Sequence, residues 1–304
     1  MYHGIINVYK EAGYTSHDVV AKLRGICGQK KIGHTGTLDP DAVGVLPVCL
    51  GNGTRLCDML SDRSKEYIAV MRLGIITDTQ DISGKVLRKN EAEVSRQEAE
   101  TAIMGFLGDS MQVPPMYSAL KVNGKKLYEL ARQGKEVERC PRPVKIYELQ
   151  ILEESHPEYT FRVVCSKGTY IRTLCHDIGQ ALGCGGVMVS LKRTRVGEFG
   201  IEDARKLSEL QKLADEGRLS EVICPAEKMF EGLPVLVAKE ESSKALMNGN
   251  QLKPWEVVLQ GKPQNAEIGN GDRFRVYSCQ SQFYGIYEYR EERDLFFPVK
   301  LFFE

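Results

Sequence analysis

A Gly-Leu-Pro sequence at residues 232–234 divides the chain into two unequal parts. Glycine and proline in succession interrupt helices and strands, so this tripeptide is a plausible domain boundary. The part before it alternates helix and strand patterns, whereas the part after it holds only short strand patterns, such as 274–277 and 283–287. The chain has 304 residues, about twice the length of a typical domain. We therefore predict two domains, at residues 1–230 and 231–304.

The composition is that of a folded globular protein. Hydrophobic residues make up 42% of the chain and charged residues 27%, which argues against disorder and against fibrous repeats. The longest charge-free runs, 42–54 and 178–191, contain glycine and are shorter than the roughly 18 apolar residues that a membrane span needs. No secretory signal is visible in residues 1–10. We therefore expect a cytoplasmic protein without a membrane partner.

Charge and metal-ligand patterns exclude several classes of function. The chain has 41 basic and 41 acidic residues, so its net charge gives no sign of a nucleic-acid partner. The nine cysteines never form a Cys-x-x-Cys motif, and we interpret them as reduced, mostly buried thiols. The five histidines form no metal-binding motif. We expect neither a metal nor a cofactor.

The first part of the chain mixes helices and strands. Strands are predicted at residues 4–10, 66–77, 144–152 and 159–165. Helices are predicted from Ser16, as the N-cap, to Gly28; from a capping box of Ser95 and Glu98 to Gly108; from Ile171 to Gly183; and from Ser208 to Gly217. Residues 33–54 contain five glycines, and we predict mainly loop or short helix there.

Residues 112–147 form a locally basic segment. They contain eight Lys or Arg and three Glu, a net charge of +5. A solvated helix with flanking loops would explain this composition, and so would an insertion that contacts phosphate groups. Composition alone favours the solvated helix.

Residues 28–47 hold two candidate motifs. The glycine spacing of residues 28–35 is that of a phosphate-binding loop, but His34 stands where such a loop has lysine, so we exclude a nucleoside triphosphate site. The following turn combines His34, Asp39 and several glycines. From the residues alone, Asp39 before Pro40 is typical of a helix N-cap, and His34 of a turn residue bonded to the backbone.

The run GHTGTLDPDAVGVLPVCLG at residues 33–51 resembles the signature of the TruB-type tRNA pseudouridine synthases, which have Gly-Thr-Leu-Asp-Pro around a catalytic aspartate. Further similarities follow in the order of the family, at residues 65–67, 118–121, 168–174 and 191–194. One departure is Val43, where the family usually has serine. The resemblance implies an α+β pseudouridine synthase fold with a mixed, largely antiparallel central sheet and flanking helices. Residues 247–251 and 285–286 look like part of a small β-rich PUA-like domain.

The family resemblance implies isomerisation of the T-loop uridine of tRNA, uridine-55, to pseudouridine without a cofactor. It assigns Asp39 as the nucleophile, Arg172 as its positive partner, and Tyr67 as the residue that packs on the uracil. Without the resemblance, Arg172 is a solvent-facing arginine of a helix and Tyr67 a half-buried strand residue.

The resemblance also implies a substrate-binding set. Its members are His34, Tyr67, Tyr170, Leu191, Lys10 and Lys121. Residues 112–147 match a family insertion that clamps the T-arm of tRNA, the partner that we expect; no obligate protein partner is evident. Two other functions stay open: a non-catalytic tRNA-binding or tRNA-folding protein on the same scaffold, and catalysis on another RNA within a guided particle.

Overall fold

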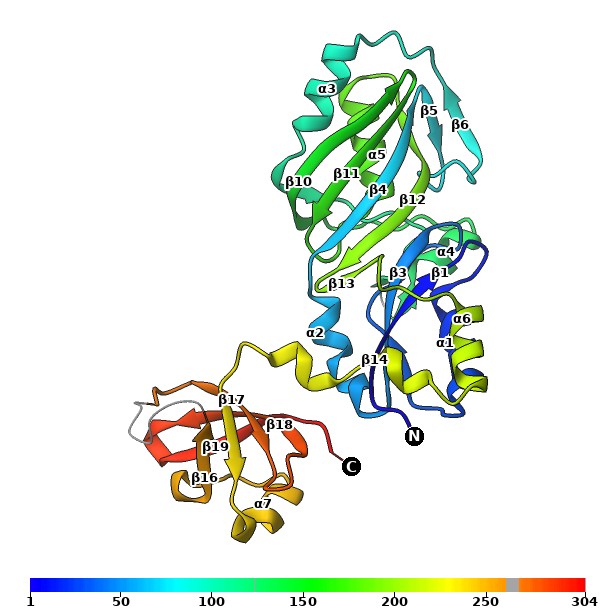
Figure 1. Cartoon of the computed structure of the whole chain (residues 1–304). Helices are drawn as coiled ribbons and strands as arrows, with labels where there is room; N and C mark the ends of the chain where they lie inside the picture. Colours follow the sequence, from blue (N-terminus) through cyan, green and yellow to red (C-terminus); the bar gives the residue numbers. More distant parts are fainter. Residues whose placement is uncertain (123, 261–267, 304) are drawn as a thin grey trace.

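The computed structural model describes residues 1–122, 124–260 and 268–303, and its main feature is a ten-stranded sheet (Figure 1). Eight strands follow the order β14-β1-β3-β12-β4-β11-β10-β7, while β2 pairs with β3 and β13 with β12. Only the β3–β12 pair is parallel among these neighbours. The strands are β1 (Gly4–Lys10), β2 (Ile32–His34), β3 (Val43–Leu50), β4 (Lys65–Leu73), β7 (Gly108–Gln112), β10 (Arg142–Ser155), β11 (Glu158–Cys165), β12 (Gly186–Val196), β13 (Phe199–Gly200) and β14 (Ile223–Cys224). The expected mixed, largely antiparallel sheet is confirmed.

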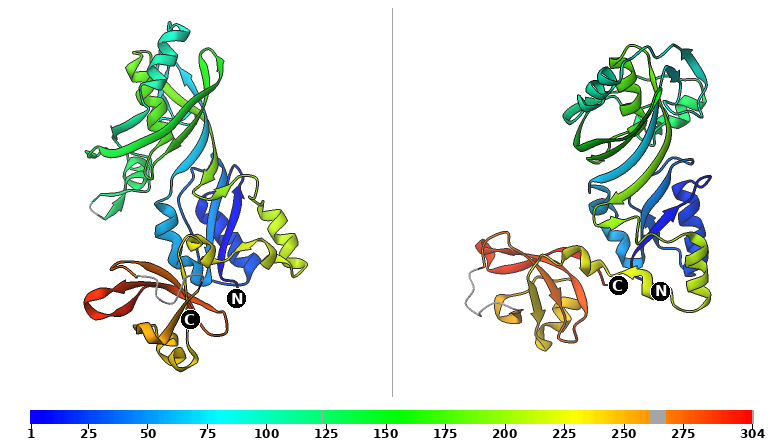
Figure 2. Two further views of the ribbon diagram at one scale, coloured as in Figure 1. Left: turned by 60° about the vertical axis from the view of Figure 1, so that its left-hand side comes forward. Right: turned by 45° about the horizontal axis from the view of Figure 1, so that its top comes forward.

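Helices flank this sheet in two groups (Figure 2). Helices α3 and α5 pack beside β10 and β12, and α1 packs with α6 beside β1. The helices are α1 (Ser16–Cys27), α2 (Cys57–Ser61), α3 (Arg96–Met104), α4 (Leu127–Arg132), α5 (Ile171–Ala181), α6 (Leu207–Asp215) and α7 (Ser243–Met247). Short 3-10 helices are η1 (Gly51–Leu56), η2 (Leu219–Val222), η3 (Ala226–Phe230), η4 (Glu240–Ser242), η5 (Pro254–Glu256) and η6 (Glu291–Arg293). None of the helices in the described part of the chain has the length and apolar character to span a membrane.

Two small hairpins lie outside the main sheet. The first joins β5 (Ile75–Thr77) to β6 (Val86–Lys89), and the second joins β8 (Lys121–Val122) to β9 (Lys125–Lys126). The second hairpin and α4 belong to the basic segment, residues 112–147. The segment therefore leaves the sheet after β7 and returns to it in β10.

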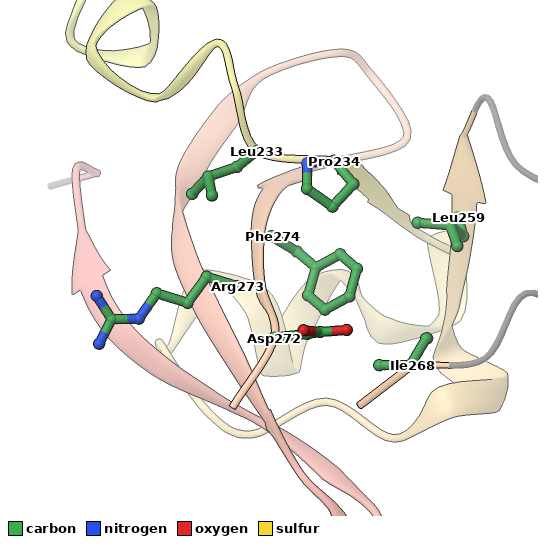
Figure 3. Close-up of a pocket in the computed structure, with 7 residues that line it drawn as sticks. All are labelled: Leu233, Pro234, Leu259, Ile268, Asp272, Arg273 and Phe274. Atoms are coloured by element: carbon green, nitrogen blue, oxygen red, sulfur yellow. The ribbon is translucent and has the colours of Figure 1, made fainter. Parts of the chain in front are cut away.

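The C-terminal part forms a separate five-stranded sheet. Its order is β16 (Val257–Gln260), β15 (Val235–Ala238), β17 (Arg273–Tyr277), β18 (Phe283–Arg290) and β19 (Leu295–Leu301), which agrees with the predicted β-rich part. A small pocket in this part is lined largely by apolar side chains, including Leu259 and Phe274 (Figure 3). The two parts meet where Phe302 packs into an apolar cluster with Ile5 and Val45. The Asn52 side-chain amide also donates to the Phe302 carbonyl at 2.9 Å.

Several element boundaries differ from the predictions. Thr15, not Ser16, caps α1, because its side chain accepts from the Asp18 N–H while Ser16 is buried inside the first turn. The capping box of Ser95 and Glu98 is confirmed, but α3 ends at Met104 with Gly105 as its C-cap rather than at Gly108. Gly108 instead enters the edge strand β7.

The predicted and observed elements differ most in the glycine-rich stretch, residues 33–54. Residues 43–50 form a strand, although we expected mainly loop or short helix. Gly44 has φ +107°, and a Cβ there would lie 2.1 Å from the Arg193 carbonyl oxygen, so this glycine allows β3 and β12 to approach closely. Conversely, the strand predicted at 66–77 is broken at Gly74, where φ is +85°.

Candidate active site

One row of the main sheet brings together residues from four distant parts of the sequence. Lys10 of β1 is paired with Gly44 of β3, which is paired with Arg193 of β12. Arg193 is in turn directly opposite Tyr67 of β4. The loop that carries Asp39 enters β3 at this row, so the pairing of the strands fixes where that loop ends.

Asp39 and Arg172 form a two-point ion pair. The Arg172 Nε lies 3.0 Å from Asp39 Oδ2, and its Nη2 lies 3.2 Å from Oδ1. Arg172 projects from the first turn of α5 with 6% of its side chain exposed, whereas 38% of the Asp39 side chain stays exposed. The interpretation of Arg172 as a solvent-facing residue is therefore wrong. Asp39 is also not a helix N-cap, because no helix follows it.

Further acceptors hold the Arg172 guanidinium in place. Its Nη2 donates to the Tyr117 carbonyl at 2.7 Å, and its Nη1 donates to the Thr79 carbonyl at 3.1 Å. Nη1 also lies 3.4 Å from Asp81 Oδ2. Asp81 stands 91 residues before Arg172, and no local motif in the sequence connects the two.

Two influences oppose each other at the Asp39 carboxyl. Burial raises its pKa above the ordinary value, and the positive charge of Arg172 acts in the opposite direction. Asp81 adds to the rise, while Lys10 reduces it. The geometry therefore supplies a partly dehydrated carboxylate whose ionised form depends on its arginine partner.

Lys10 and Ser16 hold the Asp39 loop through its backbone. The Lys10 ammonium donates to the carbonyls of Pro40 at 2.9 Å and Ala42 at 2.6 Å. The Leu38 N–H donates to Ser16 Oγ at 3.0 Å. Lys10 is fully buried, and this burial lowers its pKa to about 8.

Arg193 holds the same loop from the side of β12. Its Nε donates to the Val45 carbonyl at 2.7 Å, and its Nη2 and Nη1 donate to the carbonyls of Gly36 at 3.3 Å and Thr37 at 3.5 Å. These acceptors stand on both sides of Asp39 in the sequence. Arg193 belongs to residues 191–194, which support the family resemblance, but no local pattern marks it as a site residue.

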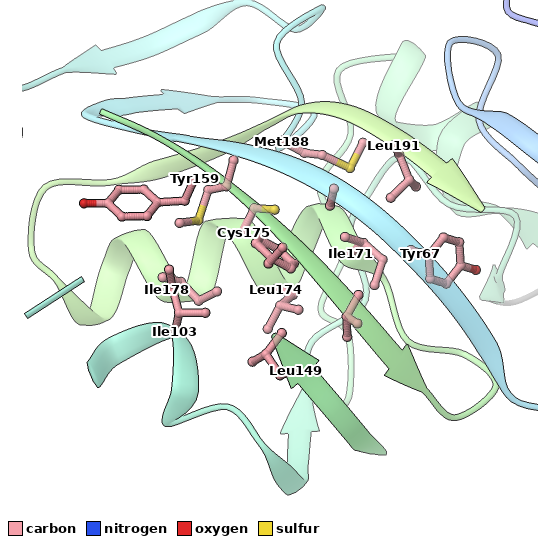
Figure 4. Close-up of a cluster of buried hydrophobic side chains, with 14 of the residues drawn as sticks. Tyr67, Ile103, Leu149, Tyr159, Ile171, Leu174, Cys175, Ile178, Met188 and Leu191 are labelled. Atoms are coloured by element: carbon pink, nitrogen blue, oxygen red, sulfur yellow. The ribbon is translucent and has the colours of Figure 1, made fainter. Parts of the chain in front are cut away.

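Tyr67 and Leu191 lie together at one end of the apolar cluster between the sheet and α5 (Figure 4). The cluster also includes Leu38 and Ala42, which flank Asp39. Burial raises the pKa of the Tyr67 hydroxyl, and the nearby Arg193 charge opposes this effect. A phenol and an apolar surface therefore stand beside the Asp39 loop.

His34 precedes the Asp39 loop, and Tyr170 precedes the helix that carries Arg172. His34 ends β2, and its Nδ1 accepts from the Gly36 N–H at 3.3 Å. Burial lowers the pKa of His34, which favours its neutral form. Tyr170 immediately precedes α5. Its backbone N–H donates to Gln112 Oε1 at 2.8 Å, and its carbonyl accepts from Gln112 Nε2 at 3.0 Å.

Lys121 stands apart from this group. It is exposed in the β8–β9 hairpin, and none of the contacts in the described part of the chain joins it to Asp39. The pocket of Figure 3 is also separate, because it lies in the C-terminal sheet. Among residues 1–122, 124–260 and 268–303, no three His, Cys, Asp or Glu side chains are grouped to hold a metal ion.

Comparison with known proteins identifies the family. The model described as "TruB family pseudouridylate synthase (N terminal domain)" matches residues 24–171, and the "tRNA pseudouridylate synthase B C-terminal domain" matches residues 172–231. The tRNA pseudouridine synthase B of Lachnoclostridium phytofermentans is 52% identical, over 99% of each chain. That of Alkaliphilus oremlandii is 47% identical, over 82% of this chain and 83% of the relative.

Solved structures give the same result at the level of the fold. A chain in an H/ACA RNP bound to a substrate RNA containing 2'-deoxyuridine has a TM-score of 0.70 and 28% identity, over 99% of this chain and 86% of that one. A chain of the archaeal box H/ACA sRNP Nop10–Cbf5 complex has a TM-score of 0.69 and 29% identity, over the same shares. On these family models and full-length relatives, the chain belongs to the TruB family of pseudouridylate synthases.

Proposed function

We propose that this protein isomerises the T-loop uridine of tRNA, uridine-55, to pseudouridine and that Asp39 is the nucleophile. The observation that carries the assignment is the two-point ion pair between Asp39 and Arg172. The relatives named tRNA pseudouridine synthase B support tRNA as the substrate. Attack on a sugar or a base requires an ionised carboxylate, and the arginine keeps Asp39 ionised in a partly dehydrated site.

The reaction is an isomerisation, so the protein supplies no net atoms. The bond between C1′ and N1 breaks, the uracil turns, C5 bonds to C1′, and the C5 proton is released while N1 gains a proton. Asp39 can add to uracil C6, attack C1′, or remove a proton from C2′. All three routes use the same carboxylate, and all three depend on the Arg172 pair.

The base must leave the stacked T loop before it can reach Asp39. An aromatic side chain that replaces the lost stacking contributes about 1 to 3 kcal/mol per base. We assign this role to Tyr67, whose hydroxyl, in its ionised form, also accepts the C5 proton. His34 occupies the space that the base vacates, and Tyr170 and Leu191 line the pocket. Lys10 supports the site by holding the Asp39 loop.

We further propose that the basic segment, residues 112–147, binds the phosphates of the T-arm. Its net charge of +5 favours this contact, and Lys121 in its hairpin is exposed. The C-terminal domain, residues 231–304, is a PUA-like module that makes additional contacts with RNA. In A-form RNA the bases of the stem are poorly accessible, so recognition depends on the shape of the T-arm and on loop bases.

A guided RNA particle is the main alternative for the substrate. The H/ACA structures that resemble this chain are an RNP bound to a substrate RNA and a Nop10–Cbf5 complex. The relative with 52% identity aligns over 99% of each chain and is named for tRNA. Its higher identity favours tRNA as the substrate.

The test uses the purified full-length protein and an unmodified tRNA transcript labelled with tritium at C5 of uridine. Pseudouridine formation replaces the C5–H bond, so it releases tritium into water. We expect release of one tritium per tRNA, mapped to the T-loop uridine. Asp39→Asn should abolish release while leaving tRNA binding intact, because the amide keeps the shape of the side chain without its charge.

The other outcomes separate the alternatives. Tight tRNA binding without tritium release from the wild-type protein would indicate an RNA-holding protein and remove the catalytic assignments. Release by Asp39→Asn at the wild-type rate would refute Asp39 as the nucleophile. Release from a uridine outside the T loop would refute the proposed target.

A further inference from the structure

We propose that Arg193 is a positioning residue for the reaction: it fixes the Asp39 loop to strand β12 and faces the Tyr67 hydroxyl, and so holds both reacting groups in register. This inference rests on the proposed function of Asp39 and Tyr67. Arg193 is 1% exposed, so it acts through these residues and not by contact with RNA.

The hydrogen bonds of Arg193 close the Asp39 loop at both ends. The carbonyls of Gly36 and Thr37 precede Asp39, and the Val45 carbonyl follows it. Because all three accept from one planar guanidinium, the two ends of the loop are held at a fixed separation. Lysine has one ammonium group in place of this fork, so it cannot reproduce the same geometry.

Strand pairing places Arg193 beside Tyr67. The two residues are directly opposite each other across β12 and β4, and directly opposite residues of an antiparallel pair share one face of the sheet. On its other side Arg193 is paired with Gly44, where a Cβ would collide with the Arg193 carbonyl. Gly44 therefore allows β3 to approach β12 closely.

The burial of Arg193 has a cost in free energy and an effect on Tyr67. Moving a guanidinium out of water is costly, and its three acceptors are neutral carbonyls, not carboxylates. The positive charge lowers the pKa of Tyr67 against the effect of burial. Cys165 from β11 and Asp39 from its loop also face Tyr67, and both raise that pKa. Among these groups, Arg193 is the one that favours the ionised hydroxyl needed to accept the C5 proton.

The experiment compares Arg193→Met and Arg193→Lys with the wild-type protein. Single-turnover tritium release is measured from pH 6 to pH 10 with protein in excess, and the dissociation constant for tRNA is measured by filter binding. We expect Arg193→Met to slow release by about 100-fold at unchanged tRNA affinity, because displacement of a reacting group by about 1 Å has an effect of that size. Its pH profile should shift to higher pH, because Tyr67 loses the charge that favours ionisation.

Arg193→Lys separates the two contributions. It keeps the charge but loses part of the carbonyl contacts. Tritium release should therefore be slower than in the wild type, while the pH profile should stay close to that of the wild type. Arg195→Met is the matched control, because Arg195 lies on the same strand but contacts Glu66 and the Gly197 carbonyl. It should keep the wild-type rate.

Three results would overturn the inference. They are wild-type release by both Arg193 variants, a loss of release that weaker tRNA binding fully explains, and identical pH profiles for Arg193→Met and the wild type. If Arg193→Met does not fold, as judged by its thermal melting, Arg193→Lys alone decides: wild-type release by this variant would refute the loop contacts. Absence of release from the wild-type protein would instead refute the proposed function.

Discussion

At the scale of single residues, the ionised form of Asp39 depends on a balance between burial and one arginine. Burial raises the pKa of Asp39 and Arg172 opposes the rise, so Arg172→Met should raise that pKa further. We expect release of tritium at neutral pH to fall by at least about 100-fold. The acidic limb of the pH–rate profile should move to higher pH, because Asp39 then ionises at higher pH.

Arg172→Lys tests the same balance with a charge in place. Its profile should move less than that of Arg172→Met, since the ammonium still favours the carboxylate. Thermal melting of both variants controls for the other contacts of Arg172, including those with Asp81 and the Tyr117 carbonyl. A loss by the same factor at every pH would contradict the electrostatic role of Arg172.

A second prediction concerns Lys10 and the pH dependence of the free energy of unfolding. Its pKa is about 8 in the folded protein and 10.5 in the unfolded chain, so between these values the unfolded state binds more protons. Relative to Lys10→Met, the wild-type free energy of unfolding should therefore rise with pH over this window, by about 3 kcal/mol in total. Urea unfolding of the two proteins from pH 7 to 10.5 measures this difference. If the free energies of unfolding of the two proteins change with pH in parallel, the prediction is contradicted.

At the scale of elements, the helices and strands that could be predicted from the sequence are those with a local pattern of side chains. The strand at 4–10 and the Ser95 capping box are examples, because side-chain periodicity and caps are local properties. The strand at 43–50 differs from the prediction, because Gly44 is explained only by the close approach of Arg193, more than a hundred residues away. For the same reason, the sequence does not mark Arg193 and Asp81 as site residues, because strand and helix packing brings their partners near.

The prediction at this scale concerns Gly44 in β3. Gly44→Ala should destabilise the protein by at least about 2 kcal/mol, because a Cβ would lie 2.1 Å from the Arg193 carbonyl oxygen at an unfavourable positive φ. Gly25→Ala in α1 is the control: a Cβ there meets nothing within 4 Å, and alanine favours a helix by about 1 kcal/mol. Chemical unfolding measures both, and equal effects would show that β3 tolerates the side chain.

At the scale of the whole molecule, charge is distributed unevenly. Positive and negative residues balance over the chain, yet residues 112–147 carry +5. This segment leaves the sheet after β7, whereas α1 and α6 pack together beside β1 (Figure 1). A neutral protein can therefore bind RNA through a basic segment, and lysines on or next to α1 and α6 should contribute little to the affinity.

Salt dependence tests this distribution. Neutralising three exposed lysines of the segment, with Lys121→Gln, Lys125→Gln and Lys135→Gln together, should weaken tRNA binding and reduce the slope of log affinity against log salt by up to about 3, because each phosphate contact releases counterions. The control changes the net charge equally at Lys22, Lys206 and Lys212, on or next to α1 and α6, and should keep the wild-type slope. Filter binding from about 50 to 200 mM salt measures both. Equal losses in the two variants would mean that net charge, and not the basic segment, governs the binding of tRNA.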